Sequence, residues 1–229
     1  PTVVIPVDFA GLPCDLQGIR SLADRYGFRI LEDASHATGA SYQGRPVGSE
    51  WADVTVFSFH AVKIITTAEG GLVTTQNDEL ARRLRLLRSH GITRNPDEMV
   101  ATPEGPWVYD QVTLGFNCRL TELQAALGRS QLRRLDQMHA ARSRLAQGYD
   151  RLLDGLPLRL PARVNDRVSA WHLYAVELDD ARTPVKRSQV FSRMRAAHIG
   201  VNVHYIPIHL QPHYRRLGFK PGDFPAAER

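Results

Sequence analysis

The feature that most constrains the fold is the alternation, over the first ninety residues, of short β-branched segments with segments of helical periodicity. Candidate strands lie at 2–7, 28–31, 54–59 and 71–75, and candidate helices at 15–26 and 78–89. Asp15 is placed to cap the first helix and Gly27 to end it. Strands that alternate with helices favour parallel βαβ units. The sequence therefore predicts an open α/β sheet, mainly parallel.

The second half of the chain has a different organisation. A loop with prolines and glycine at 96–106 precedes one long helix or two over 121–153, and 156–166 reads as a linker. Strands expected at 170–178 and 201–205 would flank a helix at 186–197, which is typical of a small α+β domain. We therefore expect three parts: a large domain at 1–120, connecting helices at 121–155 and a small domain at 156–229.

Composition bounds the class of protein. The chain has 229 residues, of which 43% are hydrophobic and 23% charged, so it can bury a substantial core. No run approaches the roughly 18 apolar residues of a membrane helix, and the first residues lack the features of a signal peptide. We expect a cytoplasmic protein without a membrane partner. Cys14 and Cys118 are far apart and are expected to be reduced thiols.

Polar side chains gather where the expected strands end. In open α/β sheets ligands bind at the carboxyl ends of the strands, and Asp33, Ser58, His60 and Lys63 fall there. Partial burial would lower the pKa of Lys63, which is the condition for forming a Schiff base, although a surface lysine or a phosphate-binding lysine is also consistent with this position. Asp33 suits the ring nitrogen of pyridoxal phosphate (PLP), and Ser58 suits its phosphate.

Five motifs, in order along nearly the whole chain, carry a resemblance. They are LEDASHATGA (31–40), FSFHAVKIITTAEGG (57–71), RSHG (88–91), LGFNCRLTELQAALG (114–128) and VHYIPIH (203–209). Together they resemble the DegT/DnrJ/EryC1/StrS family of sugar aminotransferases. The lysine and GFNCR motifs are most similar to the transaminases that act on a UDP-linked sugar in pseudaminic acid synthesis.

The resemblance implies a fold and a reaction. The fold would be type I of the PLP-dependent transferases, similar to aspartate aminotransferase, with part of the large PLP-binding domain and a truncated small domain. Family members have a longer amino-terminal portion and a further last helix, so we expect a fragment. The reaction would move an amino group from an amino acid, usually glutamate, to C4 of a nucleotide-linked 4-keto-6-deoxy sugar.

The resemblance also implies roles for individual residues. Lys63 would hold the cofactor and move the proton, and Asp33 would pair with the pyridine nitrogen. His36 would lie on the cofactor's phenolate side and Ser58 at its phosphate. Asn117 would reach the phosphate of the partner subunit in a homodimer. The remaining three residues, expected near the sugar, are His204, Tyr205 and His209.

Other interpretations compete with this one. A net charge of +5 attracts nucleic acid as well as nucleotide phosphates. The arginines at 129, 133, 134, 142, 144 and 151 favour a solvated helix face over a nucleic-acid stripe, since no aromatic residues are interleaved. The histidines at 198, 204, 209 and 213 are unevenly spaced, so we expect no metal site. A catalytically silent relative and a PLP-dependent sugar dehydratase, in which histidine replaces the lysine, remain alternatives.

Overall fold

The computed structural model describes residues 1–100 and 104–228. The chain divides into two compact units, Pro1–Glu177 and Leu178–Arg229. The first unit holds the main sheet and the long helices, and the second holds three short helices and a 3-10 turn. The three-part division at residues 120 and 155 stays a prediction.

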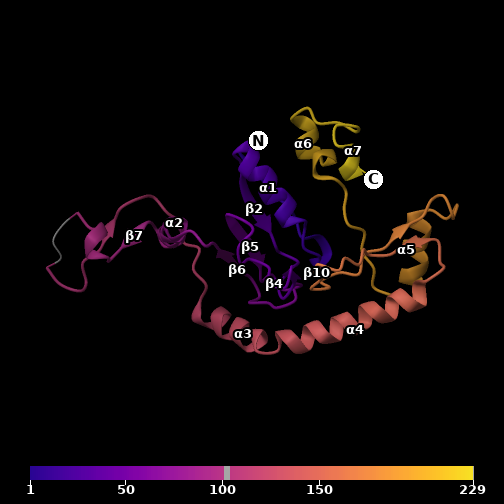
Figure 1. The fold of residues 1–229 in the computed structure, drawn as a ribbon, viewed down its shortest axis with the longest axis horizontal. Helices are drawn as coiled ribbons and strands as arrows, with labels where there is room; N and C mark the ends of the chain where they lie inside the picture. Colours follow the sequence, from indigo (N-terminus) through magenta and orange to yellow (C-terminus); the bar gives the residue numbers. More distant parts are fainter. Residues whose placement is uncertain (101–103, 229) are drawn as a thin grey trace. The chain divides into compact units, whose positions relative to one another are not determined.

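A four-stranded sheet forms the centre of the first unit (Figure 1). Its order is β1 (Val3–Val4), β2 (Arg29–Asp33), β5 (Val54–Ser58) and β6 (Gly71–Thr74). The first three strands are parallel, which confirms the predicted α/β sheet. β1 is shorter than expected because Pro6 has no N–H to continue the ladder, and Val7 makes only an isolated bridge to Asp33.

The last strand of the sheet runs antiparallel to β5, which the sequence did not predict. The connection 59–70, called here the lysine loop, contains no helix to carry the chain back across the sheet. Instead it closes on itself, since Phe59 N–H donates to Gly70 O at 2.9 Å and Thr67 N–H donates to Phe59 O at 2.9 Å. The chain therefore returns directly alongside β5.

The first helix has the caps that the sequence predicted. α1 (Leu16–Tyr26) begins where the Asp15 carboxylate accepts from Gly18 N–H, and it ends at Gly27 with φ 71°. α2 (Asp78–Arg88) is capped by the Asn77 side chain. The expected helical region 121–153 forms two helices, α3 (Glu122–Leu132) and α4 (Leu135–Leu153).

Short elements complete the two units. In the first unit these are η1 (Phe9–Gly11), η2 (Pro96–Glu98), the sheet of β10 (Arg167–Val168), β3 (Ser41–Tyr42) and β4 (Arg45–Pro46), and the pair β7 (Ile92–Thr93) and β8 (Asp110–Gln111). β9 (Leu158–Arg159) and β11 (Glu177–Leu178) pair where the first unit ends. The second unit has α5 (Arg187–Ala196), η3 (Ile208–Leu210), α6 (Pro212–Arg216) and α7 (Pro225–Glu228). Residues 101–103 of the expected loop lie outside the described residues.

Two strand predictions in the second half differ from the structure. Of the strand expected at 170–178 only the last two residues form one, as β11, whereas 170–176 is irregular because Trp171 has a φ of 52° and the backbone bonds instead to the segment after β1. Ala170 N–H donates to Gly11 O at 2.9 Å, and Leu173 N–H donates to Ala10 O at 3.2 Å. The segment 201–205 is also irregular. The helix predicted at 186–197 is confirmed as α5.

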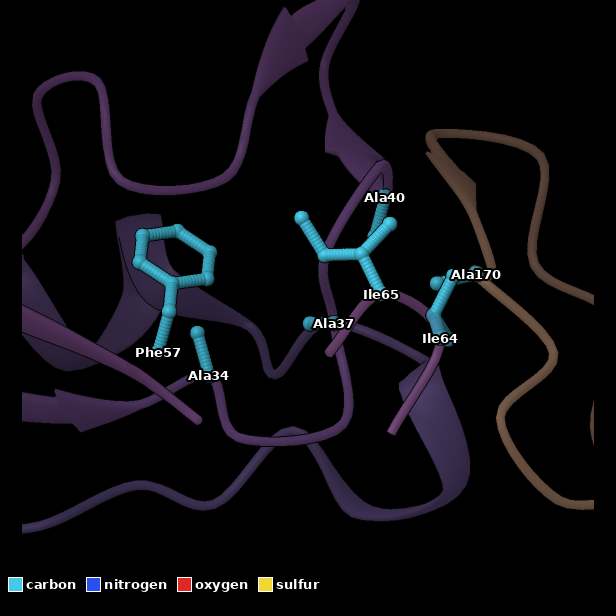
Figure 2. Close-up of a cluster of buried hydrophobic side chains, with 7 residues drawn as sticks. All are labelled: Ala34, Ala37, Ala40, Phe57, Ile64, Ile65 and Ala170. Carbon is cyan, nitrogen blue, oxygen red and sulfur yellow. The ribbon is translucent and has the colours of Figure 1, made fainter. Parts of the chain in front are cut away.

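A small apolar core lies beside the carboxyl ends of β2 and β5 (Figure 2). It brings together four stretches: the turn after β2, strand β5, the lysine loop and the segment after β10. Its buried members are Ala34, Ala37, Ala40, Phe57, Ile64, Ile65 and Ala170. The core therefore fixes the residues that follow both strand ends.

We predict that Ile65→Ala lowers the free energy of unfolding of the whole protein by about 2–5 kcal/mol, because a large buried side chain leaves a cavity. Ile65 is only 4% exposed, whereas Val62 in the same loop is 67% exposed. Val62→Ala is the matched control and should change stability by less than about 0.5 kcal/mol. Denaturant unfolding measures both, and equal losses would contradict the assignment of the core.

Candidate active site

Asp33 and Ser58 lie on the same face of the sheet, at its carboxyl edge. Asp33 is the β-ladder partner of Val56, and Ser58 follows Val56 by two residues. Since side chains alternate along a strand, these two side chains project to one side. The Asp33 carboxylate accepts from Ser35 N–H at 3.0 Å, which holds it at the strand end.

Lys63 extends from the lysine loop towards the same edge. Its backbone N–H donates to His60 O at 3.0 Å, and the next two residues, Ile64 and Ile65, are buried in the apolar core. Burial lowers the pKa of the half-buried Lys63 ammonium, and the Asp33 carboxylate acts in the opposite direction. A larger fraction of neutral amine makes Lys63 a better nucleophile. The structure therefore places Lys63 within the electrostatic influence of Asp33, and the roles of both residues toward a cofactor stay predictions.

Helix α3 holds the lysine loop from outside the sheet. Gln131 Oε1 accepts from Thr66 N–H at 2.9 Å, and Gln124 Nε2 donates to Glu69 O at 2.9 Å. Sequence reasoning did not single out either glutamine. Both glutamines lie far along the chain from the loop. The only signal in the sequence was the capping box that Gln124 completes with Thr121.

Ser58 and His60 take different places at the end of β5. Ser58 Oγ is 3.4 Å from His60 N and remains at the half-buried strand end. The His60 side chain is 48% exposed, with Nε2 at 3.7 Å from Glu69 Oε1. His60 therefore does not occupy the position of Lys63.

His36 belongs to a cluster of rings beside the core. Its Nδ1 accepts from Ala10 N–H at 3.2 Å, so in the neutral ring the proton lies on Nε2. The rings of His172 and Phe9 lie at centroid distances of 4.4 Å and 5.9 Å from that of His36. His172 was missed by sequence reasoning, because it is brought here only by the backbone bonds of 170–173 to Ala10 and Gly11.

Asn117 lies in an extended segment that is fastened to the end of α2. Phe116 N–H donates to Leu87 O at 2.7 Å, and Cys118 N–H donates to Arg88 O at 3.0 Å. Asn117 itself forms a bridge with Ser89 and has an exposed side chain. The segment therefore presents Asn117 outward on a fixed backbone.

The three residues predicted near the sugar lie in the second unit, in two environments. The rings of His204 and Tyr205 are in contact at 4.2 Å, and Tyr205 is 64% exposed. His209 is only 7% exposed, and its Nε2 lies 2.8 Å from Glu228 Oε1. His209 is thus held inside its unit, and its role toward a sugar stays a prediction.

The competing features gain no support from the described residues. Within them, no group of three or more histidine, cysteine or acidic residues could hold a metal ion. Of the arginines named above, five are exposed, and Arg142 is the exception, donating to Trp171 O at 2.9 Å. No helix among residues 1–100 and 104–228 has the length and apolar character to cross a membrane.

Comparison with known proteins decides the family. The model of the DegT/DnrJ/EryC1/StrS aminotransferase family matches residues 2–229. The chain belongs to this family. SpsC, a spore coat polysaccharide biosynthesis protein of Bacillus subtilis, is 38% identical to this chain over 98% of the chain and 58% of its own length.

Solved structures confirm the expected fold, type I of the PLP-dependent transferases. Spr1654 of Streptococcus pneumoniae, a sugar aminotransferase solved in PLP and PMP forms, is 32% identical with a TM-score of 0.83 over 99% of this chain and 60% of its own. PseC of Helicobacter pylori, an aminotransferase of pseudaminic acid synthesis, is also 32% identical, with a TM-score of 0.83 over 93% and 55%. The chain thus spans a little over half the length of these family members.

We predict that Asp33→Asn lowers the pKa of Lys63 further, because the carboxylate that stabilises its ammonium is lost. The amide oxygen can still accept from Ser35 N–H. In the cofactor-free whole protein, Lys63 should therefore react faster with an acylating reagent near neutral pH, as read by peptide mass. The exposed Lys186 in the same sample is the control. An unchanged or slower rate at Lys63 would contradict the coupling.

Proposed function

We propose that the whole protein uses PLP to move an amino group from an amino acid, glutamate, to C4 of a nucleotide-linked 4-keto-6-deoxy sugar. One observation carries the proposal: a half-buried lysine with a lowered pKa interacts with an aspartate at the next strand end. Family membership and the PLP form of Spr1654 support it. For the sugar we propose a UDP-linked substrate, as in pseudaminic acid synthesis.

The residues of the site fit this cofactor. When bound, PLP supplies an electron sink for the charge that develops on the reacting carbon. Lys63 Nζ would hold the cofactor and move the proton, while the Asp33 carboxylate would keep the ring nitrogen protonated. Ser58 Oγ would bind the phosphate, and Nε2–H of His36 would donate on the phenolate side. The bond from Ala10 N–H to Nδ1 of His36 leaves Nε2 as the donor that this role requires.

The two alternatives are less consistent with this site. A silent relative has no need of a lysine whose ammonium is destabilised by burial. A dehydratase of the kind considered above has histidine in place of the lysine, whereas here His60 lies apart at the surface. His204, Tyr205 and His209 are proposed as the residues of the second unit that contact the sugar.

We predict that borohydride reduction of the PLP-loaded whole protein labels Lys63, and that Lys63→Ala removes both the label and amine formation from a UDP-linked 4-keto sugar with glutamate. Lys186→Ala is the matched control and should retain both. Peptide mass locates the label, and a label on Lys186 or Lys220 would refute the role of Lys63. Amination of free keto acids but of no 4-keto sugar nucleotide would refute the substrate.

We also propose a homodimer in which Asn117 binds the cofactor phosphate held by the partner subunit. The segment around Asn117 exposes large apolar side chains that a second copy would cover. Their exposed fractions are 69% for Trp107, 85% for Leu114, 68% for Phe116 and 85% for Leu123. The fixed backbone of 116–118 suits Asn117 for a contact outside its own subunit.

We predict that Phe116→Asp shifts the whole protein from dimer to monomer in equilibrium sedimentation, because it places a charge in an apolar interface. Val62→Asp, at a similarly exposed position outside this segment, is the control and should leave the dimer intact.

Asn117→Ala should weaken PLP binding about tenfold, the effect of one hydrogen bond to a charged group, without changing the dimer. A wild-type monomer that binds PLP fully would remove this role of Asn117.

A further inference from the structure

Two carboxyl groups are buried on the face of the sheet opposite Asp33. Glu32 precedes Asp33 in β2, so it projects to the other side, where it is 1% exposed. Asp8, at 0% exposure, follows the bridge between Val7 and Asp33. Thr55 Oγ1 donates to Glu32 Oε2 at 2.6 Å, and Cys14 N–H donates to Asp8 Oδ1 at 2.9 Å. One oxygen of each carboxyl is thereby satisfied.

The other two oxygens, Asp8 Oδ2 and Glu32 Oε1, are buried and have no hydrogen-bond partner among the described residues. The two carboxyls act on each other, since the charge of Asp8 raises the pKa of Glu32. Two ionised carboxylates cannot hydrogen-bond, since neither carries a proton. Within the described part of the chain no lysine, arginine or histidine pairs with either group, so two adjacent buried charges would be uncompensated. A single proton between them satisfies both oxygens.

The surroundings place that proton on Glu32. Burial is the main cause that raises the pKa of Glu32 to about 8, and the charge of Asp8 adds to the increase. The hydrogen bond from Thr55 lowers the pKa of Glu32. Burial also raises the pKa of Asp8, and Asp33 adds to the increase, while the bond from Cys14 lowers it. The Cys14 thiol stays neutral, because burial raises its pKa to about 12, with Arg167 opposing. The pair therefore carries one negative charge near neutral pH.

The pair is connected to Asp33 through the backbone. Asp8 N–H donates to Asp33 O at 3.0 Å, and Asp33 N–H donates to Pro6 O at 2.8 Å. The Asp8 carbonyl in turn accepts from Gly11 N–H at 3.0 Å. Fixing the Asp8 side chain therefore fixes both peptide groups that determine where the Asp33 carboxylate lies.

We propose that Glu32 and Asp8 share one proton and act as positioning residues for Asp33. The shared proton fixes Asp8 and hence the strand end that carries Asp33. It also limits the charge behind Asp33 to a single unit. The role toward Asp33 rests on the proposed function, whereas the shared proton does not.

The first test is infrared spectroscopy of the whole protein without cofactor near neutral pH. A protonated carboxyl band is expected in the wild type and should disappear in Glu32→Gln, whose amide can still donate to Asp8 and accept from Thr55. Glu79→Gln, at an exposed salt bridge, is the matched control and should keep the band. Absence of the band from the wild type, or its persistence in Glu32→Gln, would overturn the shared proton.

The second test is the pH dependence of stability. The folded pKa of Glu32 is raised above its ordinary value of 4.5, so its stabilising contribution is complete below that value and is lost as pH rises toward about 8. Across this window loss of the Glu32 proton should raise the unfolding equilibrium constant of the wild type by up to about tenfold per pH unit. Glu32→Gln should remove this rise. Identical pH profiles for the two proteins would overturn the proposal.

The third test concerns Asp33 and uses ¹⁵N-labelled PLP. Glu32→Ala leaves Asp8 without its partner, so PLP should bind about tenfold more weakly and its ring nitrogen resonance should move toward the unprotonated position. Glu32→Gln should restore both. A folded Glu32→Ala protein with unchanged affinity and resonance would overturn the positioning role. Failure of the wild type to bind PLP at Lys63 would instead refute the proposed function, leaving the first two tests to decide the shared proton.

Discussion

The small apolar core beside β2 and β5 is the constraint on which the site depends. Ile64 and Ile65 enter it directly after Lys63, and Ala34 enters it directly after Asp33. The burial of these neighbours leaves Lys63 and Asp33 little freedom to move apart. A loop of this length without regular structure would otherwise be mobile, and its lysine would have an ordinary pKa. Apolar packing thus produces the electrostatic coupling between the two polar groups.

The alternation of side chains along β2 separates two kinds of carboxyl group. Asp33 faces the ligand edge with Ser58, while Glu32, one residue earlier, is buried with Thr55 on the reverse face. A register shift of one residue would exchange them. The parallel pairing of β2 with β5, with Asp33 opposite Val56, is therefore a condition for the proposed site as well as for the fold.

The sequence predicted those features that depend on local pattern. The caps at Asp15 and Gly27 and the strands that carry Asp33 and Ser58 were visible in single segments, and the family motifs indicated Lys63. Features that depend on distant contacts were not visible. The segment after Ala170 has the composition of a strand, but its backbone donors bond to Ala10 and Gly11 instead. The direction of β6 depended on how the lysine loop closes, and the hydrophobic periodicity of the sequence does not predict this.

The membership of Ala170 in the core has a consequence for synthesis on the ribosome. The other members of the core lie between Ala34 and Ile65, so they can assemble as soon as the sheet forms. Ala170 follows much later in the chain, after both long helices. Bringing it back to Ile65 closes a long loop, which carries an entropic cost. Until it emerges, the side of the core that Ala170 later covers stays open, and the nascent chain exposes an apolar surface next to Lys63.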